Sequence, residues 1–173
     1  YSEFPEVELF LNDRSLGRKP AGVETEYKAR YSVPYAAGSL RAVGYRNGVA
    51  AETWTLRTAG KPAIVRAIPD RDALRPNGED LAYVMVELAD EHENSVYASQ
   101  DDRAVTVRVT GAGVLAGLGN GNPVDASSLQ AASRKTFHGR VVAVVRAGTR
   151  TGAVTVEVTA EGLPTTRLKL TVK

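Results

Sequence analysis

Cysteine is absent from the 173 residues, and this absence excludes disulfides, thiolate metal sites and cysteine nucleophiles together. It leaves the redox compartment open, because a protein without cysteine tolerates either environment. Long apolar runs are also lacking. The longest is Val141 to Val145, far short of the roughly 20 residues that a membrane-spanning helix needs. We therefore expect no membrane partner.

Neither sign of charge is in large excess. The chain carries 22 Lys and Arg against 20 Asp and Glu, a formal net charge of +2. Basic residues do not gather in one part of the chain, so the electrostatic signature of a nucleic-acid-binding protein is missing. Hydrophobic residues make up 43% of the sequence, which is enough for a packed core.

The first residues, Tyr1-Ser2-Glu3-Phe4-Pro5, contain neither an initiating Met nor the basic segment that opens a signal peptide. We therefore expect this chain to be a fragment of a longer one. The compartment in which it works stays open on these residues.

Apolar and polar residues alternate along most of the first sixty positions, which predicts strands at 7–11, 15–19, 27–33, 40–45 and 49–57. Asn47-Gly48 lies between the last two strands and is a strong hairpin signal. The stretch 58–62 has no periodicity and contains Gly60 and Pro62, so we place a domain boundary after residue 60.

The second part of the chain repeats this style, with strands expected at 63–68, 84–88, 105–109, 140–147, 154–158 and 168–172. The strand at 140–147 is apolar on both faces, which predicts a central position. Residues 111–121 favour a glycine-rich turn, and 148–152 a hairpin loop. Short strands separated by Gly, Pro and Asn turns predict an all-β protein of two tandem β-sandwich modules, 1–60 and 61–173.

The most unusual stretch is Gly117 to Pro123, in which Asn and Gly indicate positive φ angles or close approach to another group. Gly119, Asn120, Gly121 and Asn122 are therefore candidates for a domain-contact loop. The alternative is a plain connection between strands. The preceding Gly111 to Ala116 matches a dinucleotide fingerprint, but the glycines that follow are incompatible with the helix that such a site needs.

Trp54 is the only tryptophan. A tryptophan in the middle of a sandwich strand is most often a core residue, and we expect Trp54 in the core. The alternative is a sugar-binding platform, since an exposed aromatic ring stacks on the C–H face of a pyranose. Tyr27, Tyr31, Tyr35 and Tyr45 could widen such a platform.

Carboxylates and histidines fall in predicted turns without the spacing of a catalytic or metal site. We interpret the carboxylates as solvated turn charges, with calcium binding by residues 90–94 as an alternative. The histidines are interpreted as surface or hydrogen-bonding residues. The residues concerned are Asp70, Asp72, Asp90, Glu91, Glu93, Asp101, Asp102, His92 and His138. We therefore expect no catalytic residue, metal or cofactor in this chain.

Several stretches in order resemble bacterial glycoside hydrolases of family 2. Residues 7–17 (VELFLNDRSLG) and 33–45 (VPYAAGSLRAVGY) are similar to one immunoglobulin-like domain of these enzymes, with Asp13 where the family has Gly. Residues 117–123 (GLGNGNP), followed by 133–135 (SRK) and 137–139 (FHG), resemble the next domain, and residues 80–84 fit an early strand of it. The resemblance covers nearly the whole chain.

This resemblance implies the C-terminal immunoglobulin-like domains of an enzyme that is most often a β-galactosidase. In that family the catalytic glutamates lie on a (β/α)₈ barrel, so none is carried over to this chain. The first module would lack its opening strand. The expected partner is the catalytic barrel of the parent polypeptide or a neighbouring subunit, and a galactoside-containing carbohydrate is a further candidate ligand. A free carbohydrate-binding or adhesive module is the alternative. The resemblance favours a periplasmic or secreted parent enzyme.

Overall fold

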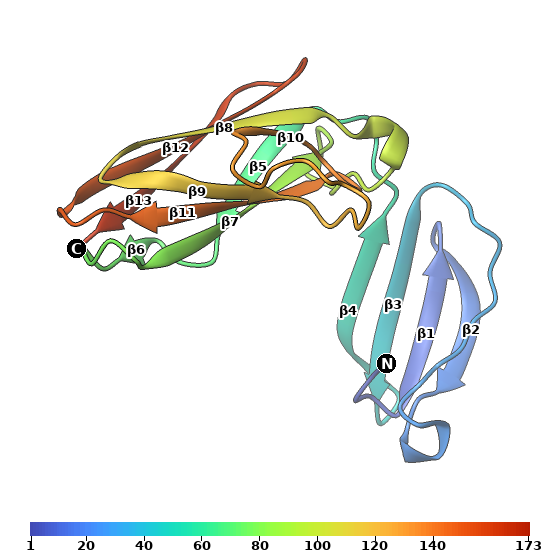
Figure 1. Cartoon of the computed structure of the whole chain (residues 1–173). Coiled ribbons are helices and arrows are strands. Elements are labelled where there is room, and N and C mark those ends of the chain that lie inside the picture. Colours follow the sequence, from blue (N-terminus) through green and yellow to red (C-terminus); the bar gives the residue numbers. More distant parts are fainter. The chain divides into compact units, whose positions relative to one another are not determined.

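A computed structural model describes all 173 residues, which divide into two compact units, Tyr1–Thr58 and Ala59–Lys173 (Figure 1). Both units are built from strands, with two 3-10 helices of three residues each and no α-helix. The predicted all-β class is therefore confirmed. The division falls two residues before the boundary expected from the sequence. No helix has the length and apolar character to cross a membrane.

The first unit is a four-stranded antiparallel sheet with the strand order β2-β1-β3-β4. Its strands are β1 (Glu6–Leu11), β2 (Arg14–Pro20), β3 (Ser39–Arg46) and β4 (Val49–Arg57). A tight turn joins β1 to β2, and another joins β3 to β4. Asn12 and Asp13 have φ angles of 49° and 63°, and Asn47 and Gly48 have φ angles of 53° and 79°. Two positive φ angles in a two-residue turn match the right-handed twist of the flanking strands.

The first unit contains one layer of the predicted sandwich, and the strand expected at 27–33 is not formed. The 3-10 helix η1 (Val23–Thr25) precedes this segment, and Glu26 and Tyr27 have φ angles of 54° and 59°. These left-handed residues break the extended course of the backbone. The segment is held by side chains instead, because the Tyr31 hydroxyl donates to the Val7 carbonyl at 2.7 Å.

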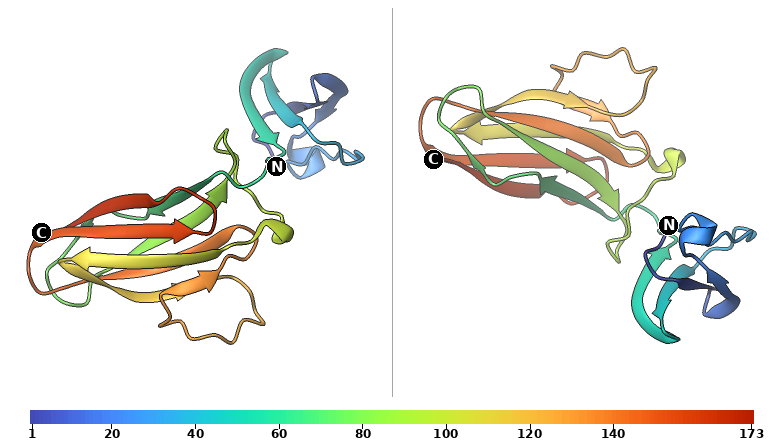
Figure 2. Two further views of the ribbon diagram at one scale, coloured as in Figure 1. Left: turned by 90° about the horizontal axis from the view of Figure 1, so that it is seen from above. Right: turned by 90° about the horizontal axis from the view of Figure 1, so that it is seen from below.

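The second unit is a sandwich of two sheets, which Figure 2 shows as two layers. One sheet has the order β10-β8-β12-β13-β6, and the other has the order β5-β7-β11-β9. The first of these is formed by β6 (Ala73–Leu74), β8 (Ala104–Gly111), β10 (Ser133–Lys135), β12 (Gly152–Ala160) and β13 (Thr166–Val172). The second is formed by β5 (Ile64–Pro69), β7 (Leu81–Ala89), β9 (Gly113–Gly119) and β11 (Arg140–Ala147). The 3-10 helix η2 (Ser99–Asp101) precedes β8.

The core of the second unit lies between the two sheets and is mostly valine. Alternate residues of each strand point inward, as the period of two predicts. Val84 and Val86 of β7 and Val145 of β11 are fully buried, as are Val154 and Val156 of β12 on the opposite sheet. β11 lies between β7 and β9, so its predicted central position is confirmed.

Two connections differ from the expectations. Residues 113–119, expected as a turn, form strand β9, which pairs with β11. Tertiary pairing overrides the low strand propensity of glycine here. Residues 148–152, expected as a hairpin loop, lead from β11 in one sheet to β12 in the other. Turn residues indicate where the chain reverses, but do not indicate which sheet the next strand joins.

Candidate functional site

The candidate contact loop begins where β9 ends. Gly119 is the last residue of β9, and residues 120–132 run from there to β10. The Asn120 side-chain amide donates to Asp125 Oδ2 at 3.0 Å and to the Lys135 carbonyl at 2.9 Å. Its Oδ1 accepts the Asn122 N–H at 3.1 Å. Asn120 therefore ties both ends of the loop together.

The loop is organised around one buried cation, Arg134 of β10, whose side chain is 2% exposed. Its Nε donates to the Leu118 carbonyl at 2.7 Å, and its Nη1 donates to Asp125 Oδ2 at 2.6 Å. The other terminal nitrogen, Nη2, donates to the Ser127 and Ser128 carbonyls at 3.0 and 2.8 Å. A buried guanidinium is stable only with such partners, so the loop path and the burial of Arg134 depend on each other.

Asp125 is the anionic partner within the loop. Hydrogen bonds from the hydroxyl and the backbone N–H of Ser127, with those from Arg134 and Asn120, hold the pKa of the Asp125 carboxyl well below its usual range. Asp125 is therefore ionised at neutral pH. The loop that it fixes presents Val124 and Leu129 to solvent, with exposed fractions of 84% and 60%. A fixed loop with exposed apolar side chains is suited to contact with another protein surface.

Sequence reasoning located this loop but missed Arg134 and Asp125. A signal was present, because Asn120, Asn122, Asp125 and Ser127 are residues whose side chains cap turns. The Asn122 and Asp125 side chains do accept backbone N–H groups two residues further on. The contact with Arg134 could not be foreseen, because it depends on how β10 lies beside the loop.

The expectation that Trp54 is a core residue is wrong. Trp54 lies on β4 opposite Ala42 of β3 and is 69% exposed, because the first unit has no second sheet over this face. A cavity of about 330 Å³ is lined by Trp54 together with Tyr1, Phe4 and Val7. The sugar platform at Trp54 stays a prediction.

The tyrosines proposed to widen the platform do not gather around Trp54. None of them lines the cavity at Trp54. The Tyr45 hydroxyl donates to Glu8, the Tyr31 hydroxyl donates to the backbone of β1 and β2, and Tyr27 and Tyr35 are exposed on the irregular segment before β3. The aromatic residues that line the cavity beside Trp54 are Tyr1 and Phe4, from the start of the chain.

Asp90 is not a solvated turn charge, because it is only 3% exposed. Its carboxyl accepts the backbone N–H groups of Gly60, His92 and Asn94 at 2.8 to 2.9 Å. The Gly60 N–H is the largest of the influences that hold the pKa of Asp90 well below its usual range. Asp90 thus fixes both its own turn and the segment that enters the second unit.

His92, His138 and Asp102 make separate contacts. The structure has no group of three or more His, Asp or Glu side chains placed to hold a metal ion. The His92 side chain is exposed, and His138 Nδ1 lies 3.0 Å from the Tyr97 carbonyl oxygen. Asp102 accepts hydrogen bonds from the Thr136 hydroxyl and the Gly139 N–H, both at 2.7 Å.

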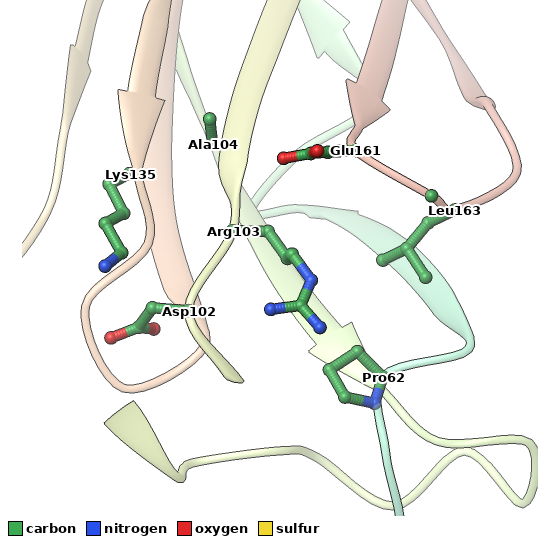
Figure 3. A pocket seen from close by; sticks show the side chains of 8 residues that line it. Pro62, Asp102, Arg103, Ala104, Lys135, Glu161 and Leu163 are labelled. Carbon is green, nitrogen blue, oxygen red and sulfur yellow. The ribbon is translucent and has the colours of Figure 1, made fainter. Parts of the chain in front are cut away.

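A cavity of about 610 Å³ lies at one end of the second unit (Figure 3). Figure 3 shows the Arg103 side chain between Asp102 and Leu163, with Lys135 and Glu161 further along the wall. Glycoside hydrolysis needs two carboxyl groups that face one bond. The carboxylates that line this cavity are those of Asp102 and Glu161, and Asp102 Oδ1 is held by hydrogen bonds from Thr136 and Gly139.

Comparison with known proteins identifies the family. The model of the glycoside hydrolase family 2 C-terminal domain 5 matches residues 65–169, and that of a domain of unknown function (DUF4982) matches residues 1–52. A β-galactosidase of Bacteroides ovatus is 34% identical over 170 residues, which are 98% of this chain and 20% of that protein.

Solved structures agree with this comparison. A family 2 glycosyl hydrolase from Bacteroides cellulosilyticus matches the whole chain with a TM-score of 0.89 and 35% identity, over 22% of its own length. A β-glucuronidase of family 2 has the same fold, with a TM-score of 0.80 at 21% identity over 99% of this chain and 18% of that one. The chain spans about one fifth of the length of these relatives. It therefore belongs to glycoside hydrolase family 2, in which it forms part of the non-catalytic C-terminal domains.

Proposed function

We propose that this chain forms accessory domains of a β-galactosidase and packs on the catalytic barrel or on a neighbouring subunit through the loop at Gly119 to Asn122. The observation that carries the proposal is the loop itself. Arg134 and Asp125 fix its path, and Val124 and Leu129 face solvent on it. A loop ordered by a buried ion pair loses little conformational entropy when it binds another surface.

The sugar assignment follows the Bacteroides ovatus relative, which is a β-galactosidase. A parent enzyme of this kind would hydrolyse terminal β-galactosides with retention, through a covalent glycosyl-enzyme, and would use two carboxyl groups of its barrel. This chain would supply neither of them. Its contribution would be to stabilise the enzyme, to shape access to the substrate or to hold subunits together.

The sugar assignment is tested by assaying the parent polypeptide with nitrophenyl β-galactoside and nitrophenyl β-glucuronide under the same conditions. We expect a higher kcat/KM for the galactoside. A preference for the glucuronide would contradict the sugar assignment and leave the accessory role untouched, because the same fold occurs in a β-glucuronidase.

The accessory role is tested by removing residues 1–173 of this chain from the parent polypeptide. We expect a loss of thermal stability, a change in subunit assembly or altered kinetic constants. A parent that keeps its stability, its oligomeric state and its kinetics without this segment would refute the accessory role.

A further inference from the structure

The two outer faces of the sandwich in the second unit differ in character. The outer face of the sheet that contains β12 is polar. Thr155 and Glu157 of β12 lie beside Lys169 and Arg167 of β13, and Glu157 forms an ion pair with Arg167. Arg108 of β8 flanks Glu157 on the other side. This composition is typical of a sheet face in contact with water.

The outer face of the opposite sheet is apolar. In one row, Ile68 of β5, Met85 of β7 and Val142 of β11 lie side by side across the three strands. In the next row, Tyr83 lies beside Val144. The residues between them along each strand are in the core, so these side chains point away from it. Ile68 and Tyr83 are 47% and 48% exposed, and the other three are half-buried.

The contact loop extends this face to the edge strand. Gly119 and Gly117 of β9 pair with Val142 and Val144, so a side chain at either glycine would point to the same outer face. Leu129 of the loop occupies that space. A Cβ atom added at Gly119 would lie 3.4 Å from Leu129 Cδ2, and the Leu118 N–H donates to the Leu129 carbonyl at 2.8 Å. Leu129 therefore continues the row of Val142, and it is 60% exposed.

The rim of this face carries more positive than negative charge. At one end, Arg66 and Arg140 share the single carboxylate of Glu87, at 2.8 and 2.7 Å. At the other end, Arg146 is exposed and has no ion pair. A complementary partner would therefore present an apolar centre with carboxylates around it.

We infer that the outer apolar face, defined as Ile68, Tyr83, Met85, Leu129, Val142 and Val144, docks against another domain of the same glycosidase polypeptide. The inference rests on the proposed function and names the surface that would carry it. The chain spans 20% of the Bacteroides ovatus β-galactosidase, so about four fifths of such a polypeptide lies outside it and can supply the partner. The face is also continuous with the proposed contact loop through Leu129.

Met85 is the only methionine of the chain and lies in the middle of this face, so its oxidation reports coverage directly. The 173-residue chain and the parent polypeptide are treated with dilute hydrogen peroxide, and sulfoxide in the Met85 peptide is measured over time by mass spectrometry. Methionine oxidation follows exposure, so we expect it to be at least about ten-fold slower in the parent polypeptide. Equal rates in the two proteins would overturn the inference.

A matched pair of variants separates docking from general destabilisation. Val142→Glu places a carboxylate on the outer apolar face, and Thr155→Glu places one on the polar outer face of the other sheet. Both positions lie on central strands, and valine and threonine have nearly the same shape. In the parent polypeptide we expect Val142→Glu to raise the Met85 oxidation rate toward that of the 173-residue chain and Thr155→Glu to leave it unchanged. Equal effects of the two variants would refute a docking role for this face.

Sedimentation velocity identifies the occupant. If the 173-residue chain is dimeric and Val142→Glu makes it monomeric, a second copy covers the face and the inference is wrong. A monomeric 173-residue chain together with protected Met85 in a monomeric parent supports docking within one polypeptide. A preference for another sugar in the nitrophenyl assay would contradict the β-galactosidase assignment alone. Failure of that assignment is therefore distinguishable from failure of the docking inference.

Discussion

Replacing Arg134 by methionine tests whether the contact loop depends on this buried cation. The change keeps an unbranched side chain of similar length but removes donors to the Leu118, Ser127 and Ser128 carbonyls and to the Asp125 carboxylate. Removing one partner of a buried ion pair lowers the free energy of unfolding by several kcal/mol. We expect a loss of about 3 kcal/mol here, because Asp125 is partly exposed. For a unit of this size that corresponds to a fall of roughly 10–20 °C in the unfolding midpoint.

The matched control for this prediction is Lys135→Met on the same strand. Lys135 is exposed and its side chain forms no ion pair, so we expect its replacement to shift the midpoint by a few degrees at most. Thermal unfolding followed by circular dichroism gives both midpoints. Hydrogen exchange then locates the effect, because amide protection within residues 118–132 falls in the Arg134 variant alone. Equal midpoints for the two variants would refute the argument that Arg134 fixes the loop.

Three further predictions concern single residues. The low pKa of Asp90 means that its contribution to stability is complete above the pKa of an unfolded Asp, about 3.9, and is lost as the pH falls further. Unfolding midpoints measured from pH 7 to pH 2 should therefore fall more steeply in the unsubstituted 173-residue chain than in its Asp90→Asn variant, and identical slopes would contradict this. Gly139→Ala and Gly162→Ala both place alanine at a φ angle near +70°, but only the first brings a Cβ within 1.8 Å of the Val96 carbonyl oxygen, so we expect Gly139→Ala to lower the unfolding midpoint markedly more. The exposed indole of Trp54 should be quenched freely by acrylamide, and a red-shifted emission that millimolar galactoside leaves unchanged would argue against a sugar platform.

Local chemistry explains which elements could be predicted. The alternation at Val154, Val156 and Val158 specifies a strand with one buried face, whatever lies opposite, and all three residues are buried in β12. Asn47-Gly48 specifies a turn, because both residues adopt positive φ angles at little cost. The loop that follows β9 was also indicated by its Asn and Gly content, although Gly117 and Gly119 belong to the strand.

Features that depend on a distant neighbour could not be predicted. Trp54 has the local pattern of a core residue, but burial needs a second sheet over β4, and the first unit has one sheet only. Gly117 and Gly119 favour a turn by propensity, but they become part of a strand because β11 offers a paired edge and Leu129 fills the space beside them.

The sequence by itself determined most of the strands, the two hairpin turns of the first unit and the family, because each of these depends on residue types within a short stretch of chain. Only the tertiary structure decided the burial of Arg134, the ion pair with Asp125 and the gathering of apolar side chains on one outer face. These features join residues from separate strands, so their energies depend on which strands are neighbours. Strand neighbours are selected by the packing of the whole sandwich, and this selection leaves no local signal in the sequence.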